Sequence, residues 1–184
     1  SATPASALHI GVTLLAPGAT GAATGRASIG KMMNGHFPVD ATVRAQGPLD
    51  STTIHDAKKS DGVSQVATVT TVSGTVEAGG TATKVAVQGV SPEFPKVVRD
   101  ESAAEGLDDN HVVGALPGVA DGSKITVTIH GKTANLTLIR HGEENEGLIA
   151  TRSVVTTLAP HARPTELQVR YQDGPDHAPA PPPR

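Results

Sequence analysis

The stretch VSQVATVTTVSGTVEAGGTATKVAVQGV, residues 63–90, decides the fold class of this 184-residue chain. Its first half is rich in Val and Thr, whose β-branched side chains favour strands, and both halves follow a strand-like pattern. Residues 77–81 interrupt the pattern and supply the glycines that a tight hairpin turn requires. We therefore predict a long strand over residues 63–76, a turn, and a partner strand over residues 83–90.

A second hairpin is predicted further along the chain. The runs 124–130 and 133–139 both alternate apolar and polar residues, and Gly131-Lys132 lies between them as the expected turn. The same alternation predicts a final strand over residues 166–171. The sequence is therefore dominated by strands.

A strand followed by a short helix is predicted before the first hairpin. Val39, Ala41 and Val43 alternate with polar residues in the period of a half-buried strand. Asp50 or Ser51 can then cap a short helix that extends to about residue 60, with positions 54 and 57 facing the core.

Composition excludes several classes of binding protein. Aromatic residues are limited to Phe37, Phe94 and Tyr171, whereas sites for sugars, bases and flat cofactors usually depend on aromatic rings. The formal net charge of -3 provides no positive field to attract phosphates, so nucleic acid is not expected as a partner. The absence of Cys excludes thiol catalysis, thiolate metal sites and disulfides.

Histidine is the one residue type that suggests chemistry, because the chain has eight of them. They do not show the spacings by which a helix presents two imidazoles to one metal ion. His141, Glu143 and Glu144 form the best candidate for a surface divalent-metal site, but a solvated acidic turn between strands is the favoured interpretation. His111, which follows two aspartates, is interpreted in the same way.

No catalytic residues are expected. The sequence lacks a Gly-x-Ser-x-Gly nucleophile elbow, and its glycine-containing stretches do not lie between a strand and a long helix as phosphate loops do. We therefore expect a protein that is not an enzyme and has no cofactor.

The two ends of the chain differ from its centre. Residues 1–36 combine apolar residues with glycines and predict a poorly packed arm, partly helical over residues 22–34, with Met32 and Met33 in contact with the body. Residues 174–184 are dense in proline and predict a disordered tail.

The order of these elements resembles the extracytoplasmic domain of FtsX-like or MacB-like ABC-transporter permeases. The resemblance rests on a strand, a Gly-Val entry into a long strand, the end of its partner strand, and the second hairpin. The segments that carry it are Phe37–Val43, Asp61–Val66, Lys84–Ser91, Gly122–Thr128 and Gly131–Ile139. Residues 6–28 resemble the outer end of the first membrane helix of that family.

The resemblance implies an α+β fold with two subdomains. A porter-like, βαβ-containing subdomain is expected from residues 37–95 and 160–173. A smaller, mainly β subdomain, residues 96–159, is expected to be inserted between these segments.

The resemblance also implies a mechanical role at the extracytoplasmic side of the cell membrane. The domain is expected to pass ATP-driven motion of membrane helices to an extracellular protein or a hydrophobic substrate. Its implied partners are a cytoplasmic ATPase, reached through the rest of the permease, and a second copy in a homodimeric transporter. A free secreted or surface-attached binding module without catalysis is the alternative.

Overall fold

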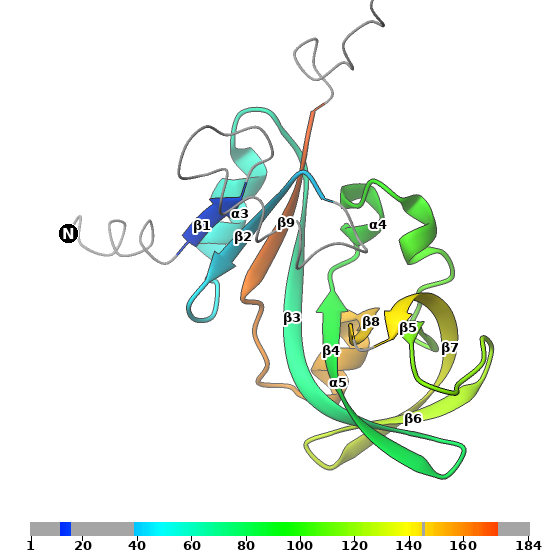
Figure 1. Ribbon diagram of the computed structural model, residues 1–184. Helices are drawn as coiled ribbons and strands as arrows, with labels where there is room; N and C mark the ends of the chain where they lie inside the picture. Colours follow the sequence, from blue (N-terminus) through cyan, green and yellow to red (C-terminus); the bar gives the residue numbers. More distant parts are fainter. Residues whose placement is uncertain (1–11, 16–38, 145, 173–184) are drawn as a thin grey trace, which may run out of the picture.

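The computed structural model describes residues 12–15, 39–144 and 146–172. Within these ranges the chain forms one mixed sheet with a few short helices, which confirms the predicted α+β class. The strand order is β1-β2-β9-β3-β4-β8-β5-β7-β6, and β6 pairs in addition with β3. That extra pairing closes six strands into a barrel and leaves β1, β2, β9 and the first part of β3 as an open sheet (Figure 1).

The elements have the following bounds. The strands are β1 (Val12–Leu15), β2 (Ala41–Ala45), β3 (Val63–Ala78), β4 (Thr81–Val90), β5 (His111–Ala115), β6 (Lys124–Ile129), β7 (Lys132–Glu144), β8 (Leu148–Thr151) and β9 (Glu166–Tyr171). The α-helices are α3 (Ser51–Lys59), α4 (Phe94–Val97) and α5 (Arg152–Leu158), and η1 (Glu101–Ala104) is a 3₁₀-helix.

Strand β3 belongs to both parts of the sheet. Its first part, from Val63 to Val69, pairs with β9, and its second part pairs with β4 on one edge and β6 on the other. The strand is 16 residues long, a contour of roughly 50 Å at the usual rise per residue. The Val-rich and Thr-rich sequence that predicts this strand therefore builds the backbone of the whole molecule.

The open sheet contains a split βαβ unit. Strand β9 lies between β2 and β3 and is antiparallel to both, so β2 and β3 run parallel and α3 connects them. Successive β3 residues point to opposite faces: Val66 packs in the cluster that α3 covers, whereas Ala67 joins Phe94 of α4. The capped helix predicted at Asp50 is present, because the Asp50 carboxylate accepts the Thr53 N–H at 2.7 Å.

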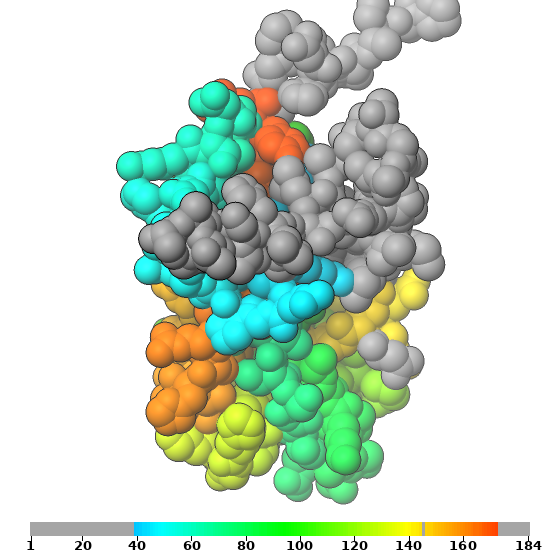
Figure 2. Space-filling model, turned by 90° about the vertical axis from the view of Figure 1, so that its left-hand side faces the viewer, coloured from blue at the N-terminus to red at the C-terminus, as the bar shows by residue number. Residues whose placement is uncertain are grey.

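The barrel encloses the largest hydrophobic cluster. Val76 and Val87 from the first hairpin, together with apolar residues of β5 to β8, fill its interior. Helix α5 adds three buried residues, Val154, Val155 and Leu158, to the same cluster. Figure 2 shows the ends of the two hairpins close together at the lower end of the molecule, in agreement with the pairing of β3 with β6.

The second hairpin differs from its predicted form in two details. The turn consists of His130 and Gly131 rather than Gly131-Lys132. His130 and Gly131 both adopt positive φ angles, and Lys132 is already paired with Ile129. Strand β7 continues to Glu144, well past the predicted end at Ile139, because its second half pairs with β5.

Most of the predicted N-terminal arm lies outside the described residues. The part described, Val12–Leu15, lies within residues 6–28, for which the resemblance implied the end of a membrane helix. It forms the strand β1 instead, because its backbone pairs antiparallel with β2. An edge strand has unpaired backbone groups, and β1 pairs with the edge of β2 that β9 leaves open. The helix predicted at residues 22–34, the contacts predicted for Met32 and Met33, and the proline-rich tail all lie outside the described residues.

The division into two subdomains stays a prediction. Strands β3 and β4 were assigned to the porter-like part, yet Val76 and Val87 share a core cluster with residues of the predicted insert. The sheet likewise continues across the boundary, because β4 pairs with β8 in parallel. Contacts between the two parts are therefore extensive.

Candidate functional site

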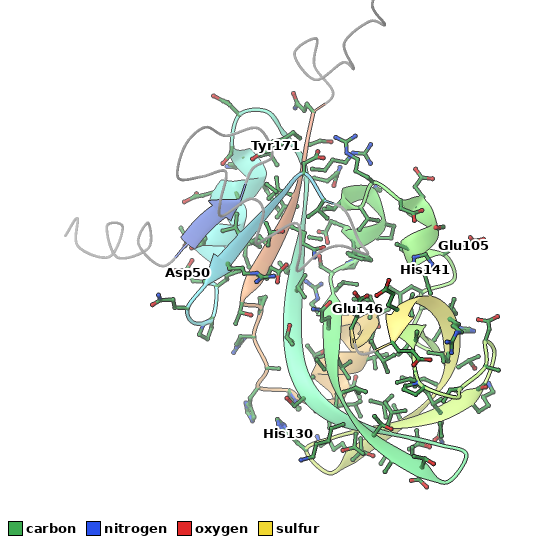
Figure 3. All side chains as sticks on the ribbon, in the orientation of Figure 1. Asp50, Glu105, His130, His141, Glu146 and Tyr171 are labelled. Carbon is green, nitrogen blue, oxygen red and sulfur yellow. The ribbon has the colours of Figure 1, made fainter. Side chains whose placement is uncertain are left out.

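The candidate metal ligands lie along β7. His141, Glu143 and Glu144 are close in sequence, but Glu144 accepts a hydrogen bond from Arg140 at 3.2 Å. In the part of the chain that the structure describes, no three His, Cys, Asp or Glu side chains form a group able to hold a metal ion. Figure 3 shows His141 on the upper part of β7 and His130 at the tip of the lower hairpin.

The interpretation of residues 141–144 as a turn is wrong. These residues form the end of β7, where Gly142 has a φ angle of 81° and the register with β5 shifts. Gly142 allows the strand to deform locally without ending. An acidic stretch that contains a glycine is equally compatible with a turn, so the sequence did not reveal this continuation.

The other suspected group, Asp108 with His111, is part of a local turn. The Asp108 carboxylate lies 2.6 Å from Nδ1 of His111 and accepts the Asn110 N–H at 2.8 Å. These hydrogen bonds, the one to His111 first, lower the pKa of Asp108 below its ordinary value. These hydrogen bonds fix the turn that leads into β5. Among the described residues, Asp108 and His111 are not joined by a third side chain that would complete a metal site.

A hollow of about 640 Å³ lies where the open sheet meets the barrel, between α4 and α5. Val90, Phe94 and Leu107 supply apolar lining, and Asp109 accepts a hydrogen bond of 2.6 Å from the Thr151 hydroxyl beside it. The lining residues include neither a histidine nor a second carboxylate. The hollow can therefore receive an apolar group, but it lacks the paired acid and base that hydrolysis requires.

The start of β2 and the end of β9 meet at a cluster of three residues, Asp40, Arg99 and Tyr171, which we call the strand-end clamp. Arg99 donates from Nε at 2.8 Å and from Nη2 at 2.7 Å to the two Asp40 oxygens, which is the bidentate geometry of a strong ion pair. Asp40 also accepts the Tyr171 backbone N–H at 2.8 Å. Tyr171 is labelled at the upper end of the sheet in Figure 3.

The strand-end clamp keeps Asp40 charged. Burial opposes ionisation, but the hydrogen bonds from Arg99 and Tyr171 and the charges of Arg99 and Arg170 outweigh it, so the pKa of Asp40 lies below its ordinary value. The pKa of the Tyr171 hydroxyl is raised, first by burial and then by the Asp40 charge. The clamp is therefore held by charge at neutral pH.

A partly buried carboxylate, Glu166, lies on the face of the open sheet away from α3. Arg44 is its register partner on β2, and its Nε lies 3.5 Å from Glu166 Oε2. Burial raises the pKa of Glu166, and the Arg44 charge and a hydrogen bond from Gln168 oppose that change without cancelling it. Glu166 therefore holds its proton to higher pH than an ordinary carboxyl group does.

Sequence reasoning missed the strand-end clamp. Asp40 is 59 residues from Arg99 and 131 residues from Tyr171. Spacing rules apply over one or two turns of helix or across a hairpin, so they carry no signal for contacts at such separations.

No helix within the described ranges is long and apolar enough to cross a membrane. No protein-family model matches the sequence, and no curated protein matches it.

The comparison with solved structures identifies the fold. The extracellular domain of the noncanonic ABC-type transporter YknZ from Gram-positive bacteria superposes with a TM-score of 0.50 at 14% identity, over 69% of this chain and 75% of that one. The periplasmic region of MacB from Actinobacillus actinomycetemcomitans gives a TM-score of 0.49 at 12% identity, over 70% of this chain and 68% of that one. The described body therefore has the fold of the extracellular domain of an ABC-type transporter, as the sequence resemblance predicted.

Proposed function

We propose that this chain is the extracytoplasmic domain of an ABC-transporter permease and works without catalysis. In this role, ATP hydrolysis by a cytoplasmic ATPase moves the membrane helices, and the domain passes that motion to an extracellular protein or hydrophobic substrate. The observation that carries the proposal is the course of β3, which connects the end of the molecule at the strand-end clamp to the closed barrel.

The strand-end clamp supports a membrane-facing assignment for its end of the molecule. Asp40 at the start of β2 and Tyr171 at the end of β9 are joined by a hydrogen bond, and Val63 at the start of β3 pairs with Tyr171. The described chain from residue 39 onward therefore starts and ends at one end of the open sheet, whereas β1 begins beside Ala45 at the other end of β2. A membrane helix that follows β9 attaches at this end and can pull or twist the sheet as a unit.

The connection from that end to the barrel is suited to transmit motion. Strand β3 has ladder partners along its length, and its two faces are covered by hydrophobic clusters in the open sheet. Packed interiors have low compressibility, so a displacement at one end moves the other end instead of being absorbed between them. The barrel then presents its surface to the extracellular partner.

The proposal is tested by distance measurements in the full-length protein with its ATPase in membrane vesicles. These 184 residues contain no Cys, so Lys59→Cys and Glu77→Cys place spin labels at exposed sites of α3 and of the β3 tip without a competing thiol in the domain itself; any Cys elsewhere in the full-length protein or the ATPase is first replaced by Ser. We expect the distance from 59 to 77 within one copy to stay constant, whereas the distance between Glu77→Cys labels of two copies changes with ATP and vanadate. Identical distances between copies in all nucleotide states contradict the proposal.

The alternative, a free secreted or surface-attached binding module, is favoured by the hollow between α4 and α5. Its lining is partly apolar and its volume is in the range of ligand sites. A full-length protein that is released from cells without detergent, and that binds its ligand without an ATPase, supports this alternative.

A further inference from the structure

We infer that Arg99 of the strand-end clamp couples the membrane-facing end of the sheet to the segment from α4 to η1, residues 94–104. This inference rests on the function proposed above and assigns the second route by which motion travels through the domain. The first route is β3 itself.

Arg99 lies between two short helices, neither of which is long enough to be stable by itself. Helix α4 and η1 each span four residues, too few for an isolated helix to be stable. Phe94, Val97 and Ala103 are fully buried, so the segment is held on the core by its inner side. Polar contacts at its outer side join it in addition to the open sheet.

Arg99 supplies the strongest of these contacts. Its two hydrogen bonds to Asp40 are short and bidentate. Two neighbouring polar contacts are longer: Arg170 donates to the Lys96 carbonyl at 3.4 Å, and Lys58 donates to Glu93, just before α4, also at 3.4 Å. Removal of the Arg99 guanidinium therefore frees the segment more than the loss of either other contact.

The segment from α4 to η1 leads to the barrel. Leu107, just after η1, donates its N–H to the Ala104 carbonyl and packs in the same cluster as Phe94. Asp109 follows and bonds the hydroxyl of Thr151, the residue that caps α5. A shift of the segment is thus passed to α5 and alters the hollow between α4 and α5.

The contact is suited to open and close because it is only partly buried. The Arg99 side chain is 40% exposed and that of Asp40 is 15% exposed. Exposed ion pairs contribute little to global stability. Asp40 also retains its hydrogen bond to the Tyr171 N–H when Arg99 is replaced, so β2 and β9 stay together.

The first test is amide hydrogen exchange on the chain with Arg99→Met. We expect the amides of Val98, Ala103 and Leu107, which all donate to carbonyls of the segment, to exchange about fivefold faster. The amides in the β6–β7 ladder should keep their wild-type rates. The control Arg163→Met removes an exposed arginine from the loop before β9 and should leave all of these rates unchanged.

Two outcomes of this first test overturn the inference. One is an unchanged rate at the three segment amides. The other is an equal acceleration in the β6–β7 ladder, which indicates general destabilisation. Arg99→Lys keeps the charge and leaves Asp40 and its hydrogen bond to Tyr171 in place. It should retain part of the protection in the segment, and exchange as fast as in Arg99→Met also counts against the ion pair as the coupling contact.

The second test uses the full-length protein with its ATPase and a spin label at Glu105→Cys, beside η1. In the wild type we expect ATP to shift this label relative to Lys59→Cys, and in Arg99→Met we expect loss of that shift while the movement between copies at position 77 remains. Retention of the shift in Arg99→Met overturns the coupling role. Absence of movement at position 77 in the wild type overturns the proposed function instead, whatever the exchange data show.

Discussion

Gly89 allows α5 to pack directly on the barrel. A Cβ atom at position 89 would lie 2.7 Å from both Cβ and Cγ2 of Val155, a separation that real contacts do not reach. Val155 is fully buried, so α5 cannot move away without opening the cluster in the barrel. The glycine is therefore required by close approach and not by a turn.

Gly89→Ala is expected to lower the free energy of unfolding by about 1–3 kcal/mol through overpacking against α5. Val155→Ala in the same chain should recover part of that loss, so the two effects will not add. Urea denaturation of the wild type, Gly89→Ala, Val155→Ala and the double variant measures the loss of stability and the departure from additivity. Gly47→Ala is the matched control, because a Cβ there meets nothing within 4 Å; a Gly89→Ala chain as stable as this control contradicts the prediction.

Glu166 should make stability depend on pH in the direction opposite to most carboxylates. Its pKa is raised in the folded chain, chiefly by burial, so the folded state binds the proton more tightly than the unfolded state. That contribution to stability is present below the ordinary pKa and is lost as pH rises through the raised folded value. Asp40 has a lowered pKa, and its contribution is lost only when pH falls below the ordinary carboxylate range.

Glu166→Gln tests this behaviour because it keeps the shape of the side chain and removes its titration. We expect the wild type to lose stability relative to Glu166→Gln when pH rises from below the ordinary Glu pKa of about 4.3 to neutral pH, because the folded chain then gives up a proton that it holds more tightly than the unfolded chain does. Urea midpoints at the two pH values provide the comparison. Parallel pH profiles for the two chains would show that Glu166 is not the responsible group.

The turn between β6 and β7 shows how an element is shaped by two adjacent backbone angles. His130 has a φ of 49° and Gly131 a φ of 78°, which is the pair of positive angles of a type I′ hairpin turn. Asn is more tolerant than His of the first position, and Gly is preferred at the second. The sequence was compatible with turns at either side of the glycine.

Replacement of the turn residues should change stability in opposite directions. We expect His130→Asn to raise the free energy of unfolding by about 0.5 kcal/mol and Gly131→Ala to lower it by about 1 kcal/mol. Thermal and urea unfolding measure both changes. The control is His161→Asn, the same substitution in an exposed turn, which should change the free energy of unfolding little. An equal gain in His161→Asn would show that the gain in His130→Asn does not come from the hairpin turn.

At the scale of the molecule, the shared strand β3 predicts that the open sheet and the barrel unfold together. Tyr171 reports on the open sheet, and because it is the single Tyr of a chain without Trp, its fluorescence is specific. Far-UV circular dichroism reports on all strands. We expect coincident transitions in urea, as for one cooperative unit; a separate transition, or independent hydrogen exchange of the β6–β7 ladder, would support the predicted boundary at residues 95 and 160 instead.

The sequence by itself determined most of the elements. Alternating apolar residues predicted β2, β3, β4, β6 and β9, and the capping aspartate predicted α3, because periodicity and capping act over a few neighbouring residues. The extension of β7 was not predicted, because it depends on a partner strand far along the chain. The order of elements resembles that of FtsX-like and MacB-like permease domains, and this resemblance predicted the fold that the chain shares with the YknZ extracellular domain.

Only the tertiary structure decided how these elements meet. The pairing of β3 with β6 that closes the barrel, the contact of Gly89 with α5 and the strand-end clamp all join residues distant in the sequence. Such contacts depend on loop closure and on the shape of a common core, to which every element contributes. Local patterns therefore specify the parts, whereas the clamp and the closed barrel exist only after the whole chain has packed.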